Sequence, residues 1–133
     1  MSTGETPATD FDRWLAEEYA AGDPAGFTAL IVLVRIKKAS VKPVASTYAH
    51  VIGTELDWGA TTALLNGAGK RWDGVAFFPR RDHRSGGPLD DVSARLWRMD
   101  IEERIGDDRL VLNEGHFFDA FGRRMRIDEV EAD

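Results

Sequence analysis

The chain has 133 residues, of which 43% are hydrophobic and 30% are charged, as expected for one globular domain with a substantial core. The formal net charge of −6 argues against a general nucleic-acid binder and against an anionic membrane surface as a partner, because both interactions need a basic face. The absence of cysteine excludes disulfides, thiolate nucleophiles and thiolate zinc sites.

The N-terminal segment is predicted to be a tail followed by a helix. Residues 1–8 are small and polar and lack the basic and apolar regions of a secretory signal, so we expect a disordered tail, one domain over residues 9–130 and a cytoplasmic location. Thr9 can cap a helix from Asp10 to Ala21, with Asp12 completing a capping box. The apolar side chains on one face of this helix are Phe11, Trp14, Leu15 and Tyr19.

The longest apolar run is Phe27 to Ile36, which reads F-T-A-L-I-V-L-V-R-I. It is rich in β-branched residues and bounded by glycine and proline in front and by lysines behind, which favours a strand covered on both faces. The run is too short to cross a bilayer as a helix, which needs about 20 apolar residues. We therefore predict a central strand in which Leu30 and Val32 are buried.

Three further elements are predicted before residue 80. Val44–Ile52 favours a second strand, although a helix beginning at Pro43 is the competing interpretation. Asp57 can cap a short helix over Trp58–Leu65 that ends at an Asn-Gly pair. Asp73–Phe78 has the pattern of a short buried strand.

A strong helix is predicted from Pro88 to Ile105, with proline at its first position. One apolar stripe of this helix, which we expect to face the core, comprises Leu89, Val92, Leu96 and Met99. A second stripe on an adjacent face comprises Trp97, Ile101 and Ile105. Two stripes indicate a widely buried helix, so we expect a homodimer to bury the second stripe if the chain itself leaves it uncovered.

The C-terminal part is predicted to complete a sheet. Leu110–Leu112 can start a strand, and His116–Phe121 with Met125–Val130 can form a hairpin around Gly122. Together these elements predict a single α+β domain, in which a small, mainly antiparallel sheet is covered by two or three helices.

No catalytic motif is recognisable, and catalytic residues remain unknown at this level. The stretch from Gly67 to Lys70 lacks the first glycine and the final Ser or Thr of a phosphate-binding loop, so it reads as a simple turn. His116 with Glu114 and Asp119 is the only local cluster of possible metal ligands. His116 and Asp119 would point to opposite faces of a strand, so we expect neither a metal nor a cofactor there.

The strongest candidate site is a basic loop that precedes the predicted helix. Its residues are Arg80, Arg81, His83, Arg84, Ser85, Gly86 and Gly87. Free N–H groups at a helix start and arginine forks suit a small anionic ligand, which would accept bonds from Gly86, Gly87 and Leu89. Asp90 and Asp91 compete for the same positive potential, and a solvated surface loop is the simpler interpretation.

Three functions follow from these patterns. The first is a non-catalytic binding or interaction protein that self-associates, indicated by the many aromatic residues and the doubly apolar helix. The alternative is an enzyme that acts on a phosphorylated or carboxylated small molecule held by the basic loop, with His83 or His116 as acid or base. Nucleic-acid binding ranks last because the chain is acidic. The basic residues for it would be Arg35, Lys37, Lys38 and Lys42.

Overall fold

The computed structural model describes residues 8–22, 24–38, 40–52 and 57–127. The predicted N-terminal tail lies outside these residues except for Ala8. The elements in chain order are α1 (Asp10–Ala20), β1 (Phe27–Lys37), β2 (Ser40–Val51), α2 (Trp58–Asn66), β3 (Gly74–Arg80), α3 (Asp91–Asp107), the 3-10 helix η1 (Arg109–Glu114) and β4 (His116–Asp119).

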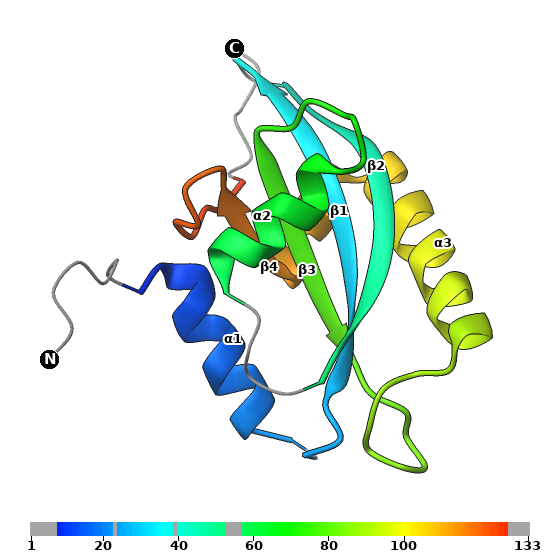
Figure 1. Cartoon of the computed structure of the whole chain (residues 1–133). Helices are drawn as coiled ribbons and strands as arrows, with labels where there is room; N and C mark the ends of the chain where they lie inside the picture. Colours follow the sequence, from blue (N-terminus) through cyan, green and yellow to red (C-terminus); the bar gives the residue numbers. More distant parts are fainter. Residues whose placement is uncertain (1–7, 23, 39, 53–56, 128–133) are drawn as a thin grey trace, which may run out of the picture.

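The four strands form one antiparallel sheet in the order β2-β1-β3-β4. The helices α1 and α2 cover one face, and α3 with η1 covers the other (Figure 1). The predicted α+β class is therefore confirmed, as is the position of β1 between two other strands. The central place of β1 follows from its continuous apolar sequence, which only a strand covered on both faces can bury.

The core is divided by the sheet into two layers, because successive side chains of a strand point to opposite faces. On β1, Ala29, Ile31 and Leu33 face α1 and α2. The predicted core residues Leu30 and Val32 are buried on the opposite face, beneath α3. Both layers are thus built from alternate positions of the same apolar run.

The segment after β1 forms a strand, so the helix considered at Pro43 is not formed. The strand β2 runs antiparallel to β1 and starts earlier than predicted, at Ser40. It lies at the edge of the sheet, where proline is tolerated because its missing N–H can face solvent. Val34 pairs with Pro43 and Leu33 with Ala45, so Val44 is the extra residue of a bulge.

The first two helices begin as their sequences predict. Thr9 accepts a hydrogen bond from the Asp12 amide at 3.0 Å, and the Asp12 carboxylate accepts one from the Thr9 amide at 3.0 Å, which completes the capping box. At the start of α2, the Asp57 carboxylate accepts a bond from the Ala60 amide at 2.8 Å. Both helices turn aromatic side chains, Phe11, Trp14 and Trp58, toward the sheet.

The start of α3 differs from the prediction. The helix begins at Asp91, with Asp90 as its cap, and Pro88 precedes it. The cause is a long-range bond: the Leu89 amide donates to the Thr28 hydroxyl at 2.9 Å, which holds this segment against β1 before the helix can start. The Asp90 carboxylate accepts the Ser93 amide at 2.7 Å, which satisfies one of the donors that a helix start leaves free.

The prediction that one stripe of this helix faces the core is wrong for Val92, Leu96 and Met99, whereas Leu89, which precedes the helix, is buried. The side of α3 that packs on the sheet contains Ala94, Ile101 and Ile105. The chain itself therefore covers Ile101 and Ile105 of the second stripe, which was expected to be buried by a dimer, while Trp97 is 43% exposed. Val92, Leu96 and Met99 lie on the opposite side and are 60%, 62% and 57% exposed. A straight helix can pack only one of its sides on the sheet. The small Ala94 allows the side that contains Ile101 and Ile105 to approach the sheet closely.

Two predictions for the C-terminal part are corrected as well. Leu110–Leu112 belongs to η1, because the Asp108 carboxylate accepts the Leu110 amide at 3.0 Å and caps a helical turn there. The strand expected over His116–Phe121 ends at Asp119. The return segment pairs with it at an isolated bridge between Phe118 and Arg124, and residues 128–130 of the predicted second strand lie outside the described residues.

Candidate functional site

The basic loop that the sequence singled out joins β3 to α3 and is closed by its own hydrogen bonds. The Asp82 carboxylate accepts the amides of Ser85 at 3.0 Å and Arg84 at 2.8 Å. The same two bonds, that of Ser85 first, hold the pKa of Asp82 below its usual value. The Gly86 amide donates to the Asp82 carbonyl at 2.7 Å. The loop therefore folds around Asp82 rather than around a space for an anion.

The three amides that the anion hypothesis requires are all used inside the protein. Gly86 donates to Asp82, Gly87 donates to the Ser85 hydroxyl at 3.2 Å, and Leu89 donates to Thr28. An anion at this loop would have to displace these bonds or rely on side chains alone. The geometry gives no support to a main-chain anion site here.

The arginines of the loop do not converge. Arg80 stacks on the Trp97 ring of α3 at 5.2 Å, and partial burial lowers its pKa. Arg81 forms an ion pair with the Glu18 carboxylate at 2.8 Å on the other side of the sheet and lies over the Phe27 ring. His83, Arg84 and Ser85 are exposed at the tip. Neighbouring positions at the end of a strand point to opposite faces, which separates Arg80 from Arg81.

The structure does assemble one hydroxyl–imidazole–carboxylate series that the sequence did not reveal. The Thr28 hydroxyl lies 2.8 Å from Nδ1 of His50, and Nε2 of His50 lies 2.9 Å from the Asp91 carboxylate. Tyr48 also donates to Asp91, at 3.3 Å. The bond from His50, the largest contribution, lowers the pKa of Asp91.

This series has the order of groups found in nucleophilic triads, but its hydroxyl cannot meet a substrate. Thr28 is 0% exposed, and its oxygen already accepts the Leu89 amide. The hydrogen bonds among Thr28, His50 and Asp91 instead hold the start of α3 against β1 and β2. Thr28 faces His50 in the strand register, so the pairing of the two strands brings the hydroxyl and the imidazole together.

The residues considered as metal ligands are occupied by other contacts. Glu114 pairs with Arg104 and Asp119 pairs with Arg123, each at 2.8 Å. His116 stacks on the Trp14 ring, and its pKa is lowered by burial first and by Arg124 second. Across the described residues, no group of three or more His, Asp or Glu side chains is placed to hold a metal ion.

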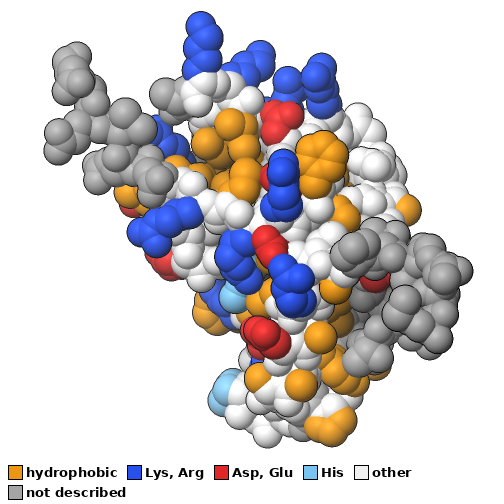
Figure 2. Space-filling view, turned by 90° about the vertical axis from the view of Figure 1, so that its left-hand side faces the viewer, with side chains coloured by type: hydrophobic (Ala, Val, Ile, Leu, Met, Phe, Trp, Pro, Cys, Tyr) orange, Lys and Arg blue, Asp and Glu red, His pale blue; other side chains and the backbone are white. Residues whose placement is uncertain are grey.

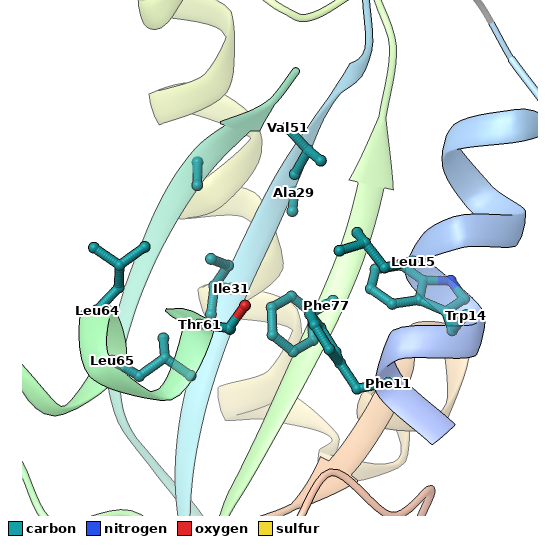
Figure 3. Close-up of a pocket in the computed structure, with 11 residues that line it drawn as sticks. Phe11, Trp14, Leu15, Ala29, Ile31, Val51, Thr61, Leu64, Leu65 and Phe77 are labelled. Carbon is teal, nitrogen blue, oxygen red and sulfur yellow. The ribbon is translucent and has the colours of Figure 1, made fainter. Parts of the chain in front are cut away.

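A small cavity lies between α1 and α2 over the sheet (Figure 3). Phe11 and Trp14 of α1 face Thr61 and Leu65 of α2 across it, with Phe77 of the sheet between them. Its volume is about 30 Å³, enough for about one water molecule. Within the described part of the chain, the buried Trp14 Nε1 and Thr61 Oγ1 have no hydrogen-bond partner.

Comparisons with known proteins identify no relative: no family model, curated protein or solved structure matches this chain. In the part of the chain that is described, no helix is long and apolar enough to cross a membrane.

Proposed function

We propose that this protein is a non-catalytic interaction module that forms a homodimer through the outer face of α3. The observation that supports the proposal is the row of exposed side chains Val92, Leu96 and Met99, which we call the outer row. Their spacing of four and then three residues is that of a helix–helix seam. Single exposed apolar residues are normal, whereas an aligned row on one helix marks an interaction surface.

The charges beside the outer row favour an antiparallel pair of α3 helices. Glu103 continues the row by one further turn, and Arg95 and Glu102 lie along one flank. A parallel pair would set Glu103 against Glu103 of the second copy, whereas an antiparallel pair sets it near Val92. The antiparallel arrangement also brings Arg95 of each copy toward Glu102 of the other, so opposite charges meet twice.

The dimer should be weak. The row contains three apolar side chains, so the interface falls below the roughly 800 Å² per partner of a stable complex. Glu102 also accepts a hydrogen bond from the Ser46 hydroxyl of β2 and lies 3.4 Å from Arg98 in its own chain, and both contacts reduce the gain from a new partner. We expect a dissociation constant on the order of 10⁻⁵ to 10⁻³ M, because little apolar area is available to offset the cost of association.

Sedimentation velocity over a range of protein concentrations tests the proposal. The wild-type protein should shift from monomer toward dimer, and Leu96→Lys should remove the shift because it places two charges in a two-fold symmetric interface. Leu64→Lys is the matched control, since Leu64 of α2 is 68% exposed and Leu96 is 62% exposed. A wild-type chain that stays monomeric at millimolar concentration, or equal effects of both variants, would contradict the proposal.

The enzyme alternative has less support, because the amides of Gly86, Gly87 and Leu89 are used internally and Arg80 and Arg81 point apart. The cytoplasm remains the proposed compartment on the basis of the sequence alone.

A further inference from the structure

The lysines of this acidic chain gather at one end of the sheet. The chain has four of them: Lys37 and Lys38 at the turn between β1 and β2, Lys42 on β2, and Lys70 between α2 and β3. These two connections lie together at the top of Figure 1, and Figure 2 shows basic side chains gathered at the same end. A local positive potential can therefore exist on a chain whose net charge is −6.

One of these lysines, Lys70, lines an open pocket that runs along α2 from Trp58 to Asn66 and also includes Ala120, just after β4. Its volume is about 390 Å³, within the usual range for small-molecule sites. The side chains that determine its chemistry are Trp58, Thr62, Asn66, Lys70, Arg71 and Trp72. We call it the tryptophan pocket.

The aromatic walls of the tryptophan pocket are held in place before any ligand arrives. The rings of Trp58 and Trp72 meet edge to face, with centroids 6.3 Å apart and an angle of 84°. Nε1 of Trp72 donates to the Asn66 side-chain oxygen at 3.0 Å, which fixes the ring and leaves the Asn66 amide nitrogen as a donor. Trp58 belongs to the core beneath α1 and α2, where it contacts Phe11 at 5.0 Å, and it is only 9% exposed. The half-buried Trp72 therefore supplies most of the aromatic surface of the pocket.

Neither Lys70 nor Arg71 forms an ion pair within the described part of the chain, although the charge of Arg71 contributes to lowering the pKa of Asp73. The nearby acid is Asp73, whose carboxylate accepts the Ile36 amide at 2.7 Å and pairs with Arg35 at 3.2 Å. The hydrogen bonds of the Asp73 carboxylate go to Ile36 and Arg35 of β1, so Asp73 offsets the charge of Arg71 only from a distance and both Lys70 and Arg71 can attract an external anion.

We propose that the tryptophan pocket binds a planar aromatic molecule that carries an anionic group, such as a nucleoside monophosphate. The ring packs against the partly exposed Trp72 indole, and the anion is held by Lys70 and Arg71, with the Asn66 amide as a further donor. Neither half of the ligand alone satisfies the pocket, because inorganic phosphate leaves the Trp72 indole uncovered and a neutral ring leaves Lys70 and Arg71 without a bound anion. This proposal is independent of the homodimer.

Nuclear magnetic resonance of the tryptophan indole N–H groups provides the test, with adenosine 5′-monophosphate as the probe. The Trp58 and Trp72 signals should shift with a dissociation constant of about 0.1–1 mM, as expected for a small ligand held by a few contacts. The Trp97 signal is an internal control, since this residue lies on α3 across the sheet. Adenosine and inorganic phosphate should each bind at least about tenfold more weakly. Benzoate tests whether a carboxylate can replace the phosphate.

Variants distinguish binding in the tryptophan pocket from nonspecific electrostatic attraction of the nucleotide. Lys70→Gln/Arg71→Gln should weaken binding of the nucleotide about tenfold and leave the weak binding of adenosine unchanged. The charge-matched control Arg84→Gln/Arg109→Gln, at positions outside the pocket, should leave both unchanged. Trp72→Leu should weaken both. The proposal is overturned if the Trp58 and Trp72 signals do not move up to about 10 mM nucleotide, or if the control variant loses as much affinity as the pocket variant.

Discussion

Truncating one residue on each side of α3 should show which side packs on the sheet, because only truncation of the packed side should lower the unfolding free energy substantially. Ile101 is 1% exposed and packs in the core layer with Leu30 and Phe78, so Ile101→Ala removes buried methyl groups and leaves a cavity. Such changes cost about 2–5 kcal/mol of unfolding free energy. Leu96 is 62% exposed, so Leu96→Ala should change the unfolding free energy by less than about 0.5 kcal/mol. The slightly better helix propensity of alanine acts in the same direction at both positions.

Urea unfolding followed by circular dichroism measures both values. The protein concentration should be low micromolar, so that dissociation of a dimer does not contribute to the apparent stability. The difference between the two variants is more reliable than either value, because extrapolation errors are shared. A loss above about 1.5 kcal/mol for Leu96→Ala, or below about 1 kcal/mol for Ile101→Ala, would refute the described orientation of α3.

Three further predictions concern stability. Thr61→Val should stabilise the protein by about 1 kcal/mol in thermal or urea unfolding, because it removes a buried hydroxyl that lacks a partner; a loss of that size would show that the hydroxyl is hydrogen-bonded in solution. The Ile36 amide, which makes the largest contribution, lowers the pKa of Asp73, so Asp73 should stabilise the fold above its unfolded pKa of about 3.9, and this contribution should fade as the pH falls through the lower folded pKa. Asp73→Asn should flatten that acid limb, and an unchanged limb would contradict the assignment. Gly26→Ala should cost more than about 2 kcal/mol, because Gly26 has φ +96° and an added Cβ would lie 2.0 Å from the Val51 carbonyl oxygen; a small cost would contradict this backbone geometry.

The parts of the fold that could be predicted are those with local signals. The run that forms β1 carries its own evidence in its β-branched residues and its flanking glycine and proline. Thr9 and Asp57 cap their helices through amides only three residues away, so the cap is visible in the sequence itself. A central antiparallel strand covered by helices follows from these signals without knowledge of distant contacts.

The orientation of α3 could not be predicted in the same way. Both of its stripes are apolar, and the choice between them depends on what the sheet offers in three dimensions. Ala94 contributes to the choice of the packed side, because its small side chain lets the helix approach the sheet. Alanine adds little to an apolar sequence pattern, so this contribution is not visible in the sequence. The late start of α3 depends on Thr28, which lies 61 residues before Leu89.

The internal hydrogen bonds of the candidate loop could not be predicted for a related reason. The sequence shows that the Arg80–Gly87 loop is rich in arginine and glycine. It does not show that the glycine amides donate hydrogen bonds within the protein. Asp82 was the available signal, because aspartate commonly accepts amides two or three residues further on in a turn. The tryptophan pocket joins residues of α2 and the following connection, and its lysine appeared in the sequence only as part of a failed phosphate-loop motif.

The most direct test of the central claim, the antiparallel dimer of α3, is a cysteine cross-link. The chain has no cysteine, so Val92→Cys and Glu103→Cys each introduce a single thiol. The antiparallel pair places position 92 of one copy near position 103 of the other, within the roughly 7 Å between Cα atoms that a disulfide allows. Mixing the two variants at high concentration under mild oxidation should therefore give the mixed disulfide, while each variant alone gives little. A Glu103→Cys variant that links to itself as readily would indicate a parallel pair, and no disulfide in any mixture would contradict the α3 dimer.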